Sequence, residues 1–110
     1  MKTKTKDQIL RSKDIKTERV NIPEWNTDVF IKGMSSHDKD IFEVKYSKSS
    51  NLRAAYAVFC VCDKDGKLLF DESDIEALGS KSASALSKIF DVATRLNGYS
   101  KEDINELEKK

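Results

Sequence analysis

The residues with the clearest chemical potential lie in Asp63–Gly66, an acidic stretch that directly follows an apolar run. If Gly66 takes the sixth position of an EF-hand calcium loop, Asp63 and Asp65 fall at positions three and five and Glu72 at position twelve. Position one is then Val61, where such loops normally carry an aspartate, so one charged ligand is missing. A β-turn that ends in glycine explains the same residues. We therefore predict a turn here, and no metal or other cofactor.

The single histidine, His37, lies beside Ser35 and Ser36 and before Asp38. A general base needs a partner nucleophile. Ser35, however, is better explained as the cap of a helix, because Asp38 follows three residues later in a variant of the capping box. The chain has no Gly-x-Ser-x-Gly, phosphate-cradling glycine loop or paired-histidine motif. We expect no enzymatic activity.

Two cysteines, Cys60 and Cys62, are separated by one residue within the apolar run. A disulfide between them would strain the backbone, and a zinc site would need a second pair of ligands. We interpret them as buried thiols that pack as small hydrophobic side chains.

Composition places the chain among small globular proteins. Its 110 residues fit one domain, which we assign to residues 7–110 after a mobile basic tail at residues 1–6. The net charge of +1 argues against general affinity for nucleic acid. No apolar segment of a signal peptide follows the basic start, so we expect a cytoplasmic protein.

The stretch from Ala54 to Cys62 contains no charged residue. It is too short to cross a bilayer, which takes about 20 residues. A helix that is apolar on every side must be enclosed by other elements, so we predict a central buried helix from Asn51 to Val61. Val58, Phe59 and Val61 leave a buried strand as the alternative. The strong helix formers at the start of the stretch favour the helix.

The segment before this helix predicts a β-hairpin, with strands at Glu18–Ile22 and Asp28–Lys32. A helical turn over Asp7–Ser12, anchored by Ile9 and Leu10, precedes it. Trp25 lies in the hairpin turn, where it either covers the core or forms an exposed anchor for a partner. We favour the first role and retain the second as a candidate.

The other expected helices are Ser36–Tyr46, a short one after Asp71 that ends with Gly79 in the left-handed conformation, a long one from Ser80 or Ser82 to Leu96, and a last one from Ser100 onward. The long helix is clearly amphipathic. We expect Phe59 to be buried. We also expect burial of three side chains of the long helix, Leu86, Ile89 and Phe90. The fold class is therefore α+β, an N-terminal hairpin packed on four to five helices around the central one.

The helix over Ser36–Tyr46 has two separate apolar edges. Ile41 and Val44 lie together, whereas Phe42 and Tyr46 lie about 100 to 140° further round. We assign the first edge to the core and the second to a partner surface. Ile104 and Leu107 join this surface, because a final helix of about ten residues is marginal alone. We therefore expect Phe42, Tyr46, Ile104 and Leu107 to contact a client or neighbouring subunits.

A run of motifs resembles the tail assembly chaperones of long-tailed bacteriophages with non-contractile tails. It covers roughly Asp7 to Glu108 and comprises Ile-Pro-Glu-Trp at 22–25, Cys-Asp-Lys-Asp-Gly-Lys-Leu-Leu-Phe at 62–70, Asp-Ile-Glu-Ala-Leu-Gly-Ser-Lys-Ser at 74–82, Leu-Asn-Gly at 96–98 and Ser-Lys-Glu-Asp-Ile at 100–104. The resemblance implies a non-enzymatic protein that binds the tape measure protein in the host cytoplasm, self-associates and is absent from the mature virion.

The resemblance also implies a longer form made by ribosomal frameshifting. Glu108-Lys109-Lys110 is compatible with an adenine-rich slippery run in the gene. Two alternative functions remain open: a structural tail-completion or connector protein of the virion, and a small protein-interaction adaptor. A nucleic-acid-binding protein comes third, because the charge balance disfavours it.

Overall fold

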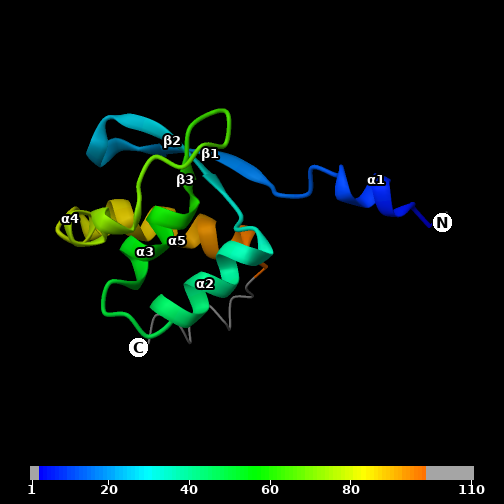
Figure 1. The fold of residues 1–110 in the computed structure, drawn as a ribbon. Coiled ribbons are helices and arrows are strands. Elements are labelled where there is room, and N and C mark those ends of the chain that lie inside the picture. The colour runs from blue at the N-terminus through cyan, green and yellow to red at the C-terminus, as the bar shows by residue number, and fades with distance from the viewer. Residues whose placement is uncertain (1–2, 99–110) are drawn as a thin grey trace.

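The computed structural model describes residues 3–98 (Figure 1). Over this range the chain is α+β, with five helices and a three-stranded antiparallel sheet in the order β1-β2-β3. The sheet lies on one side of helices α2 to α5 (Figure 1). The helix expected from Ser100, with Ile104 and Leu107, lies outside the described residues. None of the described helices is long and apolar enough to span a membrane.

The N-terminal hairpin forms as predicted. Strands β1 (Thr17–Ile22) and β2 (Thr27–Lys32) pair antiparallel, with Val20 opposite Val29. The connection is a short 3-10 helix, η1 (Pro23–Trp25), followed by Asn26 in the left-handed conformation at φ 52°. Alternation places Ile22, Val29 and Ile31 on the buried face.

Helix α3 (Leu52–Cys60) is the predicted central helix, and every residue from Ala54 to Cys60 is buried. It contacts α2, α4 and α5. Strand β3 (Val61–Cys62) follows it without a loop and pairs with β2, Val61 opposite Ile31. The expectation of a two-stranded hairpin was therefore incomplete. The β-branched Val61 leaves the helix and covers the edge of β2, whose backbone groups would otherwise lack partners.

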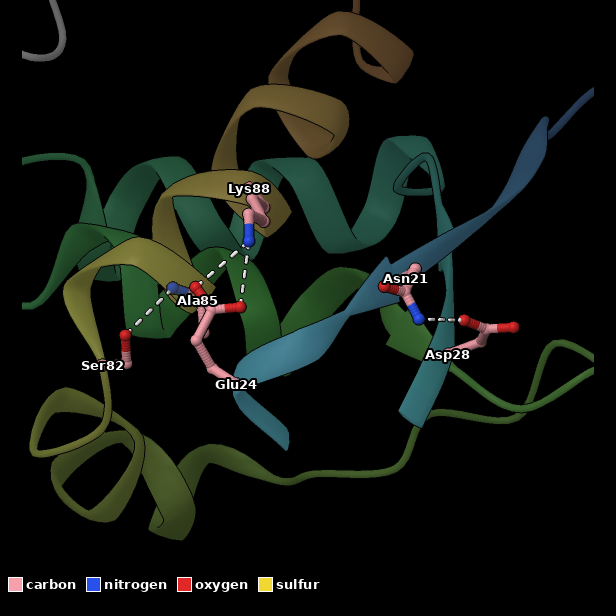
Figure 2. Close-up of polar contacts among 6 residues, drawn as sticks. All are labelled: Asn21, Glu24, Asp28, Ser82, Ala85 and Lys88. Atoms are coloured by element: carbon pink, nitrogen blue, oxygen red, sulfur yellow. Dashed lines mark hydrogen bonds and ion pairs between the residues drawn. The ribbon is translucent and has the colours of Figure 1, made fainter. Parts of the chain in front are cut away.

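Helix α5 (Ala83–Leu96) is the predicted amphipathic helix. Of the two serines proposed as its cap, Ser82 has this role, because its Oγ accepts from the Ala85 amide at 3.3 Å (Figure 2). Leu86, Ile89 and Phe90 are buried as expected.

The end of α5 is fixed to the loop before α2. Asn97 accepts from the Met34 amide at 2.8 Å and donates to the Ala93 carbonyl at 2.7 Å. Gly98 follows at φ 84°, a conformation that glycine adopts without strain. The predicted stop at 97–98 is therefore confirmed.

Helix α4 (Ile75–Gly79) follows the 3-10 helix η2 (Glu72–Asp74), which Asp71 caps. The expected role of Gly79 was wrong, because the glycines with positive φ are Gly66 and Gly98. A Cβ on Gly79 would lie 3.0 Å from the Asn51 Oδ1 atom. Glycine is therefore favoured here by the close approach of α4 to the start of α3.

Helix α1 (Lys6–Leu10) forms the predicted turn, but not the predicted contacts. Ile9 and Leu10 are 58% and 72% exposed, so they do not anchor the turn to the core. Figure 1 shows α1 away from the rest of the domain, at the end of an extended segment. A capping box between Thr5 and Gln8 holds its first turn.

Two ion pairs fasten α5 to the hairpin. Lys88 Nζ lies 2.9 Å from Glu24 Oε1 (Figure 2), and an Arg95 guanidinium nitrogen lies 2.7 Å from Glu18 Oε2. Hydrogen bonds from Ser84 and Lys88 lower the pKa of Glu24 to about 2. The ionised form of Glu24 is therefore favoured in the folded protein.

We predict that Phe59→Ala lowers the free energy of unfolding by ~3–5 kcal/mol, because this ring of α3 is buried where the helix packs against Phe42 of α2. Chemical denaturation measures this loss. A loss under ~1 kcal/mol would contradict the placement of α3 at the centre of the core.

We also predict an acid-dependent contribution from Glu24. Its pKa is about 2 in the folded protein against 4.5 ordinarily, so the ionised group stabilises the fold above pH 4.5 and loses this effect as the pH falls toward 2. Denaturation at stepped pH should show a steeper loss of stability in the wild type than in Glu24→Gln across this window. Glu76→Gln on α4 is the control, since Glu76 joins none of the ion pairs among residues 3–98. Equal slopes in wild type and Glu24→Gln would refute the assignment.

Candidate protein-binding groove

An apolar groove of about 240 Å³ opens beside helix α2 (Ser36–Tyr46). Val58 and Phe59 of α3 form its floor. Its other apolar lining residues, which we call its walls, are Ile41 of α2 and Leu68 and Phe70 of the segment after the turn. Asp38, Asp71 and Glu72 lie at its rim. We call this set of residues the α2 groove.

The wall opposite α2 exists because the chain reverses at Asp63–Gly66. Asp63 Oδ1 accepts from the amides of Asp65 at 2.8 Å and Lys67 at 3.0 Å, and Gly66 takes φ 85°. These backbone hydrogen bonds lower the pKa of Asp63. The predicted turn is therefore present, and the carboxylate that the calcium hypothesis needed serves the turn itself.

After this turn the chain runs back along β3. The Leu69 amide donates to the Val61 carbonyl at 3.1 Å, and Leu68 forms a bridge with Cys62. Side chains alternate along extended backbone. Leu68 and Phe70 line the α2 groove, whereas Leu69 between them is 53% exposed.

The predicted faces of α2 were wrong at Phe42 and Val44, although Ile41 packs against the core as expected. Phe42 is 3% exposed and Val44 is 87% exposed, so the core face centres on Phe42. Its ring centroid lies 4.5 Å from that of Tyr56 and 5.6 Å from that of Phe59. Aromatic rings bury more apolar area than valine and gain from tilted contacts. The rings of α3 therefore determine which edge of α2 faces inward.

Tyr46 joins the end of α2 to η2. Its hydroxyl donates to Glu72 Oε1, and Lys45 Nζ lies 3.4 Å from the same oxygen. The hydrogen bond to the carboxylate raises the pKa of Tyr46, and the hydroxyl in turn lowers the pKa of Glu72. The rim of the α2 groove is thus acidic, with Lys45 held against one of its carboxylates.

Two other hollows lie at the root of the N-terminal segment. One of about 580 Å³ lies between residues 14–16, residues 33–36 and the end of α5. The other, of about 360 Å³, lies between residues 12–17 and the turn at Asp65 and Gly66. Both are bounded by the exposed chain before β1. The α2 groove, in contrast, is formed by the packed body of the domain.

The two cysteine side chains contribute to packing in the core. Cys60 and Cys62 are free and buried, as predicted, and burial raises the pKa of Cys60 to about 12. The thiolate that a nucleophile or metal ligand requires is therefore strongly disfavoured. Within residues 3–98, no group of three or more His, Cys, Asp or Glu side chains is arranged to hold a metal.

The predicted partner residues within 3–98 lie at two different depths. Trp25 is half-buried against the core, consistent with the covering role that we favoured. Tyr46 is half-buried and bonded to the groove residue Glu72, and Phe42 is buried against Phe59 of the groove floor. Sequence reasoning missed Ile41, Leu68 and Phe70 as groove walls. The alternation of Leu68 and Phe70 after a turn was the available signal.

Comparison with known proteins gives one informative match. No family model and no curated protein matches this chain. The solved structure of the bacteriophage HK97 tail assembly chaperone is similar, with a TM-score of 0.62 and 18% sequence identity. The match covers 86% of this chain and 94% of that chain. The chain therefore has the fold of a phage tail assembly chaperone, as the sequence resemblance implied.

We predict that two alanine substitutions on α2 differ strongly in their effect on the free energy of unfolding. Phe42→Ala should lower the free energy of unfolding by ~3–5 kcal/mol, because it leaves a cavity among aromatic rings. Val44→Ala should change it by no more than about 0.5 kcal/mol, because the side chain is in solvent. Chemical denaturation of both variants tests this, and a larger loss for Val44→Ala would restore the original assignment of faces.

Proposed function

We propose that this protein is a non-enzymatic tail assembly chaperone that binds the tape measure protein of its phage during tail morphogenesis. The observation that carries the proposal is the shared fold across 86% of this chain and 94% of the HK97 tail assembly chaperone. The order of sequence motifs supports it independently of the coordinates. The two free, buried thiols and the turn-bound Asp63 are also consistent with a binding protein.

The α2 groove suits an apolar stripe on a helical client. It is apolar at its floor and on two walls, so it can receive side chains repeated at three and four residues along a helix. At about 240 Å³ it lies below the usual range of roughly 300–1,000 Å³ for small-molecule sites. Its acidic rim favours a stripe flanked by lysine or arginine.

Residues predicted from sequence extend this surface in our proposal. Tyr46 donates a hydrogen bond to Glu72 at the rim of the α2 groove, whereas Phe42 packs against Phe59 in its floor. We retain Ile104 and Leu107 as contacts for the client or for neighbouring subunits. Trp25 remains a further candidate at the hairpin.

The proposed role places the protein in the host cytoplasm and outside the mature virion. It also includes self-association and a frameshift-extended form. The reading frames around the codons of Glu108-Lys109-Lys110 decide whether this extended form exists.

Co-expression with the tape measure protein tests the proposal. Wild-type chain should keep that client soluble and co-purify with it. Leu68→Ala/Phe70→Ala should reduce the recovered client about tenfold or more, because removing two groove side chains costs at least ~1.4 kcal/mol of binding. Leu69→Ala is the matched control, because Leu69 lies in the same segment and is exposed.

Three results would contradict the proposal. Client that is equally soluble without the chain would exclude a chaperone role. Client retained by Leu68→Ala/Phe70→Ala at the wild-type level would place the binding surface elsewhere. The chain itself, detected by mass spectrometry as a stoichiometric part of purified virions, would favour the structural tail-component alternative.

A further inference from the structure

The segment Thr3–Lys16, which we call the arm, carries a short helix that buries none of its residues against the rest of the described chain, residues 3–98. Every residue from Thr3 to Thr17 is exposed. Yet the arm contains helix α1, closed at its start by the capping box of Thr5 and Gln8. A free helix of five residues is far too short to be stable in water. Its helical state therefore calls for a surface on which Ile9 and Leu10 become buried.

The hairpin aims the arm away from the domain. The Gly33 amide donates to the Lys16 carbonyl at 3.0 Å, which continues the β1–β2 ladder by one step beyond Thr17. The chain then leaves along the direction of β1, and Figure 1 shows α1 projecting from the body. Five residues separate α1 from that hydrogen bond. Arg11, the first of them, is still helical, and the other four span at most roughly 14 Å. The arm is thus presented outward, where a second molecule can meet it.

The arm and the α2 groove are complementary in polarity and in charge. Ile9 and Leu10 form an apolar stripe on α1, and Lys6 lies on the same face one turn earlier. Five residues of the arm are basic and two are acidic. The groove is apolar inside, with Asp38, Asp71 and Glu72 at its rim. A short basic amphipathic helix is therefore the occupant that this groove matches.

We propose that the arm of one copy docks in the α2 groove of a second copy, with Ile9 and Leu10 inserted between Ile41 and Leu68. Donor and acceptor surfaces differ, so the contact is head-to-tail and each copy keeps one free arm and one free groove. Such contacts build rings or open filaments. The client and the arm then compete for the same groove. This inference rests on the self-association included in the proposed function. Its test contains no client, so a failed arm contact leaves client binding to be judged by the co-expression experiment alone.

Sedimentation of the full chain from micromolar to near-millimolar concentration tests the contact. Wild type should associate, and less so at high salt, because the charges lie at an exposed rim. Ile9→Asp/Leu10→Asp removes the arm's stripe and should weaken association about tenfold or more. Leu68→Asp should do the same through the groove, with Leu68→Ala as the milder variant if the first does not fold. Leu69→Asp, on the exposed face of that segment, should associate as wild type.

Mixing the two defective chains distinguishes this mode from a symmetric one. The arm variant has an intact groove, and the groove variant has an intact arm. An equimolar mixture should therefore form a 1:1 dimer and nothing larger, although each chain alone stays monomeric. A mixture that stays monomeric would overturn the proposal. So would wild-type association by the arm variant, or a strictly monomeric wild type, which is also the result expected if the arm folds onto its own groove.

Discussion

The fold depends on one constraint: α3 is apolar on every side and must be enclosed. Seven consecutive residues from Ala54 to Cys60 are buried, so the helix has no face left for solvent. The sheet, α2, α4 and α5 each cover part of it. Small residues allow close approach, as at Ala54, Ala55 and Ala57, while Tyr56 and Phe59 fill the wider gaps. The Tyr56 ring contacts Phe42 on one side and Phe90 on the other, which places α2 and α5 through a single side chain.

The α2 groove is a consequence of this enclosure. Because α3 continues directly into β3, the orientation of the helix also sets the position of the turn at Asp63–Gly66. That turn returns the chain so that Leu68 and Phe70 face α2 across the floor of Val58 and Phe59. The hydrogen bond between Tyr46 and Glu72 then fixes the distance between the walls at one end. The surface that we assign to partners is therefore built on the most buried part of the protein.

Sequence patterns predicted the parts of this fold that depend on local signals. The hairpin, the cap at Ser35 and the stop at Asn97-Gly98 follow from residue types at fixed offsets, and all three occur. The apolar run was correctly predicted as a helix, and its strand-like end became β3.

The predictions that failed depend on packing between residues that are distant in the sequence. The inward face of α2 is decided by rings on α3, and the exposure of Ile9 and Leu10 by the direction in which β1 leaves the sheet. Glycine at position 79 is favoured by Asn51, which a Cβ there would approach to 3.0 Å. Periodicity within one segment contains none of this information.

We assign the apolar stripe of the client to the α2 groove. Amide hydrogen exchange of the free chain and of its complex with the tape measure protein tests it most directly, because it reports protection along the whole backbone. Binding should slow exchange at 67–72 and along α2. Exchange at the outward strand β1 should stay unchanged. Protection confined to β1 and the hairpin turn around Trp25, with 67–72 unaffected, would contradict it.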